Sequence, residues 1–350
     1  MRVALLAHLH HAIAEPFLGG TEMHTALVAN ELVRRGHDVT LFAKEGSQTL
    51  ARLDPILPAD FVYGQAFDAT GADQSHEIVT AAAHDAITRI LRDGYDIVFN
   101  NSLGPLPYTE LPDHPMITVL HTPPTLERVL AIIEVPGWAP GPRHGFVSVS
   151  EFNAAAWRRV LPSTQCIPNG IYLDQWCDLG GATSDLAVWS ARITPEKGLP
   201  LAIEAARKAG MRLEFGGPIA NRDYFAAEVA PLLGEDVVHH GHLDHVQLAS
   251  LLSRGQVFIA SALWAEPFGL SMVEAMACGT PVAAFPRGAA AEVVSAGGGF
   301  VAADCTAPAL ADAILLAREL DRTGVRDSVR RYDASVMIDR YEALMEQLIA

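Results

Sequence analysis

The sequence is poor in lysine and in long hydrophobic runs, and each scarcity limits what the protein can be. Only three of its 25 basic residues are lysines, and 41 acidic residues bring the formal net charge to −16. Binding of nucleic acid needs clustered cations, so this balance argues against it. The same charge disfavours docking to an anionic membrane, although a local basic patch would still permit it. No apolar run approaches the ~18 residues of a membrane span.

Cysteine is also scarce. The four cysteines are widely spaced and match no zinc pattern: Cys166, Cys177, Cys278 and Cys305. We therefore expect reduced thiols and a cytoplasmic protein. The apolar residues 1–7 resemble a short signal sequence, but three histidines follow at once and no cleavage-like site is present, so we predict a first strand there.

Several catalytic motifs are missing. The chain has no Gly-x-Ser-x-Gly elbow, no Gly-x-x-x-x-Gly-Lys-Ser/Thr loop and no His-Glu-x-x-His helix. These absences argue against hydrolases of those types, kinases and zinc proteases. After the first predicted strand, Gly19 and Gly20 lack the Gly-x-Gly-x-x-Gly spacing of a dinucleotide site. They fit either a flexible turn or a backbone that can approach a diphosphate.

What the chain has is a regular alternation of strands and helices in both halves of its 350 residues. Apolar runs predict strands at 3–7, 39–43, 96–99, 116–120 and 145–149, and at 186–191, 211–215, 237–240, 257–260 and 282–285. Helices are expected between them, among others at 75–92, 199–209, 271–278 and 304–320. A last helix at 334–348 places Val336 and Tyr341 on its apolar face. Residues 173–185 lack periodicity and are predicted to link the halves. The pattern predicts two doubly wound parallel sheets of the α/β class.

Residues 264–282 carry the most informative stretch. A turn containing Glu266 leads from a buried strand into a helix containing Glu274, and Gly279 ends that helix. The backbone N–H groups of Phe268, Gly269 and Leu270 are free to bind an anion or a hydroxyl at the helix start. Two carboxylates beside such a start suit a ligand with both phosphate and hydroxyl groups, such as a nucleotide sugar.

Basic and histidine side chains supply further candidates. Arg192 and Lys197 share one loop, which is either a solvated basic loop or a pair of cations for a diphosphate. His121 leaves a strand in a proline-bounded loop, where it is either structural or faces a ligand. Four histidines between 239 and 245 look like a metal cluster, but their spacing fits no helical pair and no carboxylate–cysteine set completes it.

Taken together, these stretches resemble retaining glycosyltransferases of family 4, which have the GT-B fold, and the resemblance covers nearly the whole chain. The matching motifs are Gly19-Gly20-Thr21-Glu22, His121, Ile167-Pro-Asn-Gly170, Arg192 with Lys197-Gly198, and the E-x7-E signature from Glu266 to Glu274. Residues 287–292 lack the Gly-Gly pair and the proline that many members carry. This departure leaves the roles of Arg287 and Glu292 open.

The resemblance implies two Rossmann-like doubly wound domains that face each other across a cleft. Residues 1–170 would form the acceptor domain and 171–332 the sugar-nucleotide domain, with the helix at 333–350 packed back on the first. His121, Glu266, Arg192 and Lys197 would be the catalytic residues. Donor-binding residues would be Gly19, Gly20, Arg192, Lys197, Gly217, His242, Leu243, Glu266, Phe268, Gly269, Leu270 and Glu274, and acceptor-binding residues Asn101 and Thr122. No metal and no cofactor is expected beside the donor.

The resulting hypothesis is transfer of a hexose from a nucleotide diphosphate sugar to an acceptor hydroxyl, with the anomeric configuration retained. UDP-glucose or a close relative is the first donor and GDP-mannose the second, and the acceptor is expected to be a soluble small molecule. The alternatives are a GT-B sugar-nucleotide epimerase, for which we find no additional acid/base carboxylates, or a sugar-nucleotide-binding protein without catalysis. Oligomeric state is left open.

Overall fold

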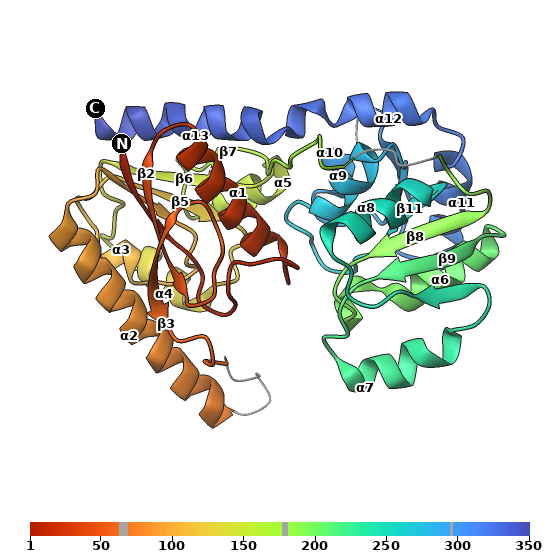
Figure 1. Cartoon of the computed structure of the whole chain (residues 1–350), viewed down its shortest axis with the longest axis horizontal. Helices are drawn as coiled ribbons and strands as arrows, with labels where there is room; N and C mark the ends of the chain where they lie inside the picture. The colour runs from red at the N-terminus through yellow and green to blue at the C-terminus, as the bar shows by residue number, and fades with distance from the viewer. Residues whose placement is uncertain (63–68, 177–180, 295–296) are drawn as a thin grey trace. The chain divides into compact units, whose positions relative to one another are not determined.

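Two compact units, each built on one parallel β-sheet, make up the computed structural model (Figure 1). It describes residues 1–62, 69–176, 181–294 and 297–350. Unit 1 consists of Met1–Pro168 and Met337–Ala350, and unit 2 of Asn169–Val336. Part of the predicted linker at 173–185 lies outside the described residues, namely residues 177–180, which include Cys177. Of the other three cysteines, Cys166 and Cys278 are buried and Cys305 is partly exposed.

The sheet of unit 1 has the strand order β3-β2-β1-β4-β5-β6-β7, and all of its neighbouring strands pair in parallel. Its strands are β1 (Arg2–Leu6), β2 (Asp38–Lys44), β3 (Arg52–Leu57), β4 (Ile97–Asn100), β5 (Met116–Leu120), β6 (His144–Ser148) and β7 (Gln165–Cys166). Its helices are α1 (Gly20–Arg34), α2 (Ala69–Asp93), α3 (Pro107–Glu110), α4 (Glu127–Ile133) and α5 (Glu151–Trp157), with most of α13 (Ala334–Ile349).

Strand β3 was not predicted from the sequence. It lies at the edge of the sheet, where β2 is its one neighbouring strand among the described residues, and it contains Pro55 in a segment of which only Leu57 is buried. Proline cannot donate a ladder hydrogen bond, and an edge strand is one of the few places in a sheet that tolerates it. The absence of an alternating apolar pattern therefore reflects the edge position.

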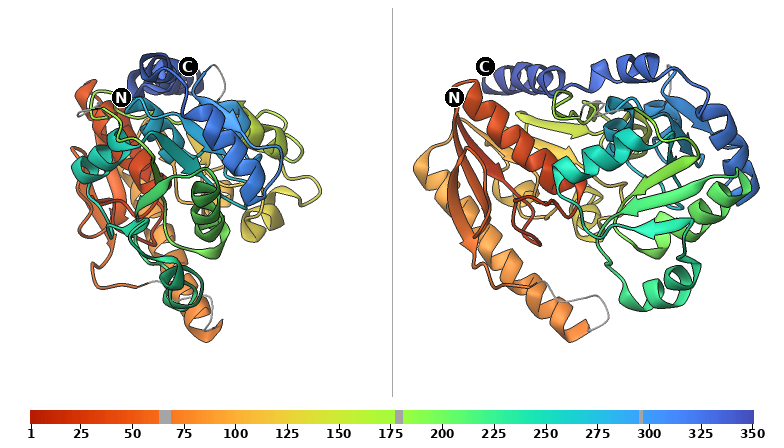
Figure 2. Two further views of the ribbon diagram at one scale, coloured as in Figure 1. Left: turned by 90° about the vertical axis from the view of Figure 1, so that its right-hand side faces the viewer. Right: turned by 45° about the vertical axis from the view of Figure 1, so that its right-hand side comes forward.

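Helix α13 packs on unit 1 through the last part of its length, and Figure 2 shows this part close to the C-terminal end of α1. Tyr341 is buried against Phe99, with ring centroids 4.9 Å apart. An added Cβ at Gly145 of β6 would approach Leu344 and Leu348 to 3.3 Å or less, so glycine in this strand makes room for the helix. The predicted apolar face is wrong at Val336, which is 42% exposed.

The sheet of unit 2 has the strand order β10-β9-β8-β11-β12-β13, again with parallel pairing throughout. Its strands are β8 (Leu186–Ser190), β9 (Arg212–Gly216), β10 (Val237–His239), β11 (Val257–Ala260), β12 (Val282–Ala284) and β13 (Gly299–Val301). Its helices are α6 (Leu199–Lys208), α7 (Arg222–Tyr224), α8 (His245–Arg254), α9 (Leu270–Ala277), α10 (Ala290–Val293), α11 (Ala307–Ala317) and α12 (Arg322–Ser328). Single helical turns are η1 (Pro195–Lys197), η2 (Phe225–Val229), η3 (Ala230–Leu232) and η4 (Arg330–Tyr332).

Helices cover both faces of this second sheet. Alternate strand residues such as Trp189, Phe215 and Ile259 share one face and form a core with α6 and α11. Helices α8 and α9 pack on the other face (Figure 1). The predicted class, two Rossmann-like parallel-sheet domains, is confirmed. Within the described ranges, none of the helices has both the length and the apolar character needed to cross a membrane.

A charged cluster fixes α13 to α1 within unit 1. Arg35 donates to Glu342 at 2.5 Å and also pairs with Asp339, while the His37 ring lies 2.8 Å from the other Glu342 oxygen. Burial tends to raise the pKa of Glu342, but the hydrogen bonds from His37 and Arg35 outweigh it and lower the pKa. A carboxyl with a lowered folded pKa stabilises the fold above its unfolded pKa, and this contribution is lost as the pH falls through the folded value.

We therefore expect Glu342→Gln to lower the stability of unit 1 by about 1 kcal/mol at pH 7, since the pair is partly exposed. The difference from the wild type should shrink as the pH falls from the unfolded pKa of glutamate, about 4.3, through the lower folded pKa of Glu342. Thermal unfolding of both proteins across this range measures the effect. The control is Glu346→Gln, an exposed change on the same helix. A difference that stays constant with pH would contradict the prediction.

Candidate functional site

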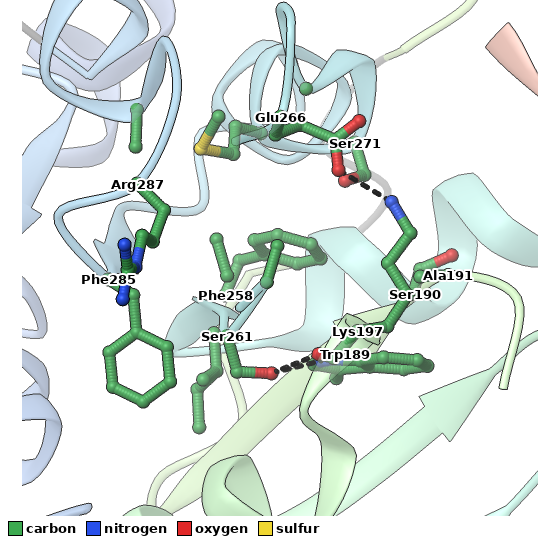
Figure 3. A pocket seen from close by; sticks show the side chains of 16 residues that line it. Trp189, Ser190, Ala191, Lys197, Phe258, Ser261, Glu266, Ser271, Phe285 and Arg287 are labelled. Carbon is green, nitrogen blue, oxygen red and sulfur yellow. Dashed lines mark hydrogen bonds and ion pairs between the residues drawn. The ribbon is translucent and has the colours of Figure 1, made fainter. Parts of the chain in front are cut away.

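The order of the strands locates a site in unit 2. Strand β8 has β9 on one side and β11 on the other, so the direction of chain winding reverses beside β8. In open α/β sheets, ligands bind outside the carboxyl ends of the strands at such a reversal. A pocket lies there (Figure 3), lined by the ends of β8 and β11, the loops after β11 and β12, and the start of α9.

An ion pair between Lys197 and Glu266 dominates this pocket. The Nζ of Lys197 donates to Oε2 of Glu266 at 2.5 Å, and both side chains are largely buried, at 16% and 22% exposure. The indole N–H of Trp264 donates to the same oxygen at 2.9 Å, and Lys197 Nζ lies 5.2 Å from the centre of the Trp264 ring. Trp264 therefore contacts both members of the charge pair and helps to hold them in place.

The loop carrying Lys197 is locked to the loop after β11. Ser261 Oγ donates to the Lys197 carbonyl at 2.8 Å and accepts from the indole N–H of Trp189 at 3.0 Å. Gly198 has a φ of 65°, and an added Cβ there would overlap the Ser261 carbonyl oxygen. Only glycine meets both conditions without strain. This packing turns Lys197, rather than another residue of the loop, toward Glu266.

Gly288 supports Glu266 from behind. Its φ is 58°, an added Cβ would overlap the backbone of Glu266, and the N–H of Ala289 donates to the Glu266 carbonyl at 2.9 Å. Arg287, whose role the sequence leaves open, lines the pocket with its Nε 3.2 Å from Cys305 Sγ. The loop after β12 thus fixes the backbone position of the first carboxylate.

The helix start predicted from the sequence is present at α9. Gly269 precedes the helix with a φ of 89° and lines the pocket. Within the part of the chain that the structure describes, the N–H groups of Phe268, Gly269 and Leu270 have no acceptor. The Phe268 ring is buried against Tyr332, with centroids 5.3 Å apart, which holds this turn.

Glu274, the second carboxylate of the signature, is 7% exposed in α9 and does not line the pocket. Burial raises its pKa to about 7. Among the described residues, none donates a hydrogen bond to its carboxylate or pairs with it. It is therefore a buried acceptor that a hydroxyl-bearing ligand would satisfy.

Several predicted donor residues lie outside the pocket. Arg192 is exposed and forms no ion pair within the described residues, although its neighbour Ala191 lines the pocket. Gly217 packs on the Ala191 carbonyl so closely that an added Cβ would overlap it, and its N–H donates to the Gly241 carbonyl at 2.7 Å. His242 is exposed and Leu243 packs against Gly216.

The histidines near 240 are used for structure. His239 Nε2 lies 3.0 Å from the Gly217 carbonyl, and His240 Nε2 lies 2.9 Å from Glu214, which Arg254 also binds at 2.7 Å. In the described ranges, no group of three or more histidine, cysteine, aspartate or glutamate side chains could hold a metal ion.

Unit 1 has its own reversal of winding, between β1 and β4, and polar side chains gather at these carboxyl ends. His8 Nε2 lies 3.3 Å from Glu22 of α1, and both side chains are buried. Burial alone would raise the pKa of Glu22, but the hydrogen bond and charge of His8 outweigh this effect, so the pKa is lowered. Gly19 and Gly20 begin α1 here, and an added Cβ at Gly19 would lie 3.0 Å from a Glu22 oxygen.

His121 follows β5 at the same edge. Its Nε2 lies 3.0 Å from Asn101 Oδ1, and burial, reinforced by His24 and His8, lowers its pKa well below the usual value. Asn101 is fully buried with both amide atoms engaged, so it supports His121 and is not exposed to an acceptor as the sequence suggested. The Thr122 hydroxyl is buried without a partner, and its carbonyl accepts from Trp157 at 2.7 Å.

Sequence reasoning missed Trp264, Gly288, His24 and Tyr341. Trp264 had a local signal, because an aromatic residue two positions before Glu266 lies in the same loop. Gly288 had none, and Tyr341 was predicted only as part of an apolar helix face, because its polar partner His24 lies 317 positions away in the chain.

Two family models match consecutive parts of the chain. The model for glycosyltransferase family 4 matches residues 18–175, and the model for glycosyl transferases group 1 matches residues 181–332. The chain belongs to the family 4-type glycosyltransferases. The predicted family is confirmed, and this glycosyltransferase combines the two sheets described above in the GT-B fold.

Individual relatives agree with this assignment. The glycosyltransferase is 26% identical over 313 residues to phosphatidyl-myo-inositol mannosyltransferase from Propionibacterium freudenreichii subsp. shermanii, which covers 81% of this chain and 77% of the relative. Sucrose-phosphate synthase from Thermosynechococcus elongatus has a TM-score of 0.79 at 19% identity, with 99% of each chain covered. Anabaena HepE, solved with UDP and glucose, has a TM-score of 0.72 at 20% identity, covering 99% of this chain and 100% of that one. Both structural likenesses are to the GT-B fold.

The support of Glu266 by Gly288 can be tested through stability. Gly288→Ala should destabilise unit 2 by about 2 to 4 kcal/mol, because it adds a backbone clash to the strain of a positive φ. Gly210→Ala is the matched control: its φ is 72°, but nothing lies within 4 Å of the added Cβ. It should cost only the ~1–2 kcal/mol of left-handed backbone strain. Thermal or denaturant unfolding compares the two variants, and equal losses would show that Gly288 does not press on Glu266.

Proposed function

We propose that this glycosyltransferase moves a hexose from a nucleotide diphosphate sugar to an acceptor hydroxyl with retention of anomeric configuration. Unit 2 would bind the donor and unit 1 the acceptor. The observation that carries the proposal is the Lys197–Glu266 ion pair at the carboxyl ends of β8 and β11. A donor with both a diphosphate and sugar hydroxyls satisfies each member of the pair separately.

The pair also indicates how the donor would be received. Lys197 and Glu266 neutralise each other's charge at 2.5 Å. A diphosphate is a stronger partner for the ammonium group, and once it takes Lys197, the Glu266 carboxylate is free to accept from sugar hydroxyls. Arg192 follows the pocket-lining Ala191, and we propose that its exposed guanidinium adds a second cation.

The start of α9 supports the same pose. The N–H groups of Phe268, Gly269 and Leu270 would donate to the sugar and phosphate oxygens, where the positive end of the helix dipole adds to the attraction. Glu274 would accept from the ribose hydroxyls, which gives a partner to a carboxylate that otherwise lacks one. Gly217, His242 and Leu243 would meet the base.

In the reaction, the bond between the anomeric carbon and the phosphate oxygen breaks as the acceptor oxygen bonds to the same face of the sugar. The acceptor proton passes to the departing phosphate oxygen, so no protein nucleophile is needed. Negative charge grows on the diphosphate, and Lys197 and Arg192 would stabilise it, with the backbone of Gly19 and Gly20 beside them. We propose that these groups take the place of a metal ion.

The choice of donor rests on weaker support. UDP-glucose is our first donor, and the structural likeness to HepE, solved with UDP and glucose, is consistent with it. GDP-mannose is the second, because one curated relative is a mannosyltransferase. In unit 1, His121 would contact the reacting sugars or the acceptor, and Thr122 has an unpaired buried hydroxyl that could receive a ligand.

Lys197→Ala should lower kcat about 100-fold, since losing one donor to the developing charge costs roughly 3 kcal/mol of barrier. The control is Lys208→Ala, which removes the other lysine of unit 2, an exposed side chain paired with Glu204. Release of nucleoside diphosphate measures both rates. An unchanged rate for Lys197→Ala, or an equal loss in Lys208→Ala, would remove Lys197 from the reaction.

Product analysis tests the proposal as a whole. We expect calorimetry to show tighter binding of UDP-glucose than of GDP-mannose. With the preferred donor and water as acceptor, NMR should show release of the sugar in the α configuration of the donor before it equilibrates. A β product would contradict retention. A changed sugar still attached to its nucleotide would indicate an epimerase, and binding without nucleotide release would indicate a protein that only binds the donor.

A further inference from the structure

A chain of buried hydrogen bonds leads from His121 through the core of unit 1 to its C-terminal helix. His121 Nε2 lies 3.0 Å from Asn101 Oδ1, and Asn101 Nδ2 lies 3.2 Å from His24 Nδ1. His24 Nε2 lies 3.3 Å from the hydroxyl of Tyr341 on α13. None of these four side chains is more than 8% exposed. The chain therefore joins β4, β5, α1 and α13 through groups that water scarcely reaches.

Thr25 gives this chain a direction. Its hydroxyl donates to the Thr21 carbonyl at 2.8 Å, so its proton is used, and the oxygen can only accept from Asn101 Nδ2 at 3.0 Å. This fixes which end of the Asn101 amide carries the nitrogen. The amide oxygen then faces His121 and requires a proton on His121 Nε2. In the same way, the amide nitrogen donates to His24 Nδ1 and leaves the His24 proton on Nε2, facing Tyr341.

We propose that Thr25, Asn101, His24 and Tyr341 are positioning residues that hold His121 as one neutral tautomer, protonated on Nε2 with a free lone pair on Nδ1. The inference rests on the proposed function for its consequence. A ring whose remaining nitrogen only accepts binds a substrate hydroxyl as donor and gives no attraction to an anionic phosphate or carboxylate. At His121, the structure thus favours a hydroxyl-bearing group of the donor sugar or acceptor.

The surroundings support a neutral ring. The His24 ring stands edge-on to His121 with centroids 4.7 Å apart, and burial lowers the pKa of His24 to about 3. The described titratable groups around His121 are His24 from α1 and His8 after β1. Tyr341 contacts His24, and Glu22 contacts His8. No carboxylate among the described residues contacts the His121 ring itself, so nothing there would stabilise an imidazolium.

The experiment is ¹⁵N NMR of the ligand-free full chain with labelled histidine, which reads the protonation of each ring nitrogen directly. His121→Gln assigns the signal. We expect a protonated Nε2 and an unprotonated Nδ1 that do not change between pH 8 and 5. Because no substrate is present, this result is independent of whether the protein transfers a sugar. A proton on Nδ1, or titration near the ordinary pKa of histidine, would overturn the proposal.

Variants test the direction of the chain. Thr25→Val keeps the shape of the side chain but frees the Asn101 amide to flip, so His121 should become a mixture of tautomers, while Thr25→Ser should restore the single one. Asn101→Asp should raise the pKa of His121, because a carboxylate beside Nε2 stabilises the imidazolium. The control is Tyr108→Phe, which changes another buried tyrosine of unit 1 and should leave the His121 signal unchanged.

In transfer assays, Thr25→Val should lower kcat/KM about tenfold and Thr25→Ser should recover it. A Thr25→Val protein with the wild-type tautomer would refute the role of Thr25.

Discussion

The reversal of winding beside the first strand of each sheet is the constraint on which the rest of the structure depends. Beside β1 and β8, the connections leave in opposite directions, and in open α/β sheets ligands bind outside the carboxyl ends of the strands at such a point. The residues that follow these strand ends can therefore be polar without removing apolar side chains from the core. Unit 2 places Lys197 and Glu266 at this position, and unit 1 places His8, Asn101 and His121.

The two reversals serve different chemistry because their side chains differ. The pocket of unit 2 holds a cation, a carboxylate and unused N–H groups, which together suit a ligand with separate anionic and hydroxyl parts. The edge of unit 1 is rich in histidines whose pKa values are lowered by burial, such as His10, at about 4, and His24. Neutral rings of this kind exchange hydrogen bonds with hydroxyl groups without attracting anions. The same sheet topology thus carries an ion pair beside a helix start in unit 2 and a group of buried histidine rings in unit 1.

The sequence predicted the fold class well, because parallel strands buried on both faces are continuous apolar runs and their connections are helical. It failed at β3, whose edge position leaves no such run, and at Val336, where the helix pattern continues past the part that packs. At the site, Glu266 and the helix start follow from a local strand–turn–helix pattern. The inward turn of Lys197 could not be predicted, because Ser261 and Trp264, more than sixty positions away, hold it there.

Contacts between residues distant in the chain also decided the outcome for Asn101 and Arg192. A polar residue at a strand end can face either a ligand or the core, and the choice for Asn101 depends on Thr25 and His24 of another element. Arg192 lies on the predicted loop but does not line the pocket, and its side chain is exposed. Sequence spacing identifies the loop, and only tertiary packing decides which of its side chains turns inward.

Glu274 also has a consequence for the energetics of folding. An ordinary glutamate titrates near pH 4.5, but burial raises the pKa of this one to about 7. Its ionisation is therefore suppressed in the folded chain, which lowers the stability of unit 2 at neutral pH by an amount on the order of 3 kcal/mol. The penalty is absent at acidic pH and grows as the pH rises. Unit 2 is thus less stable than its core would allow, and a ligand that donates to this carboxylate would return part of that free energy as added resistance to unfolding.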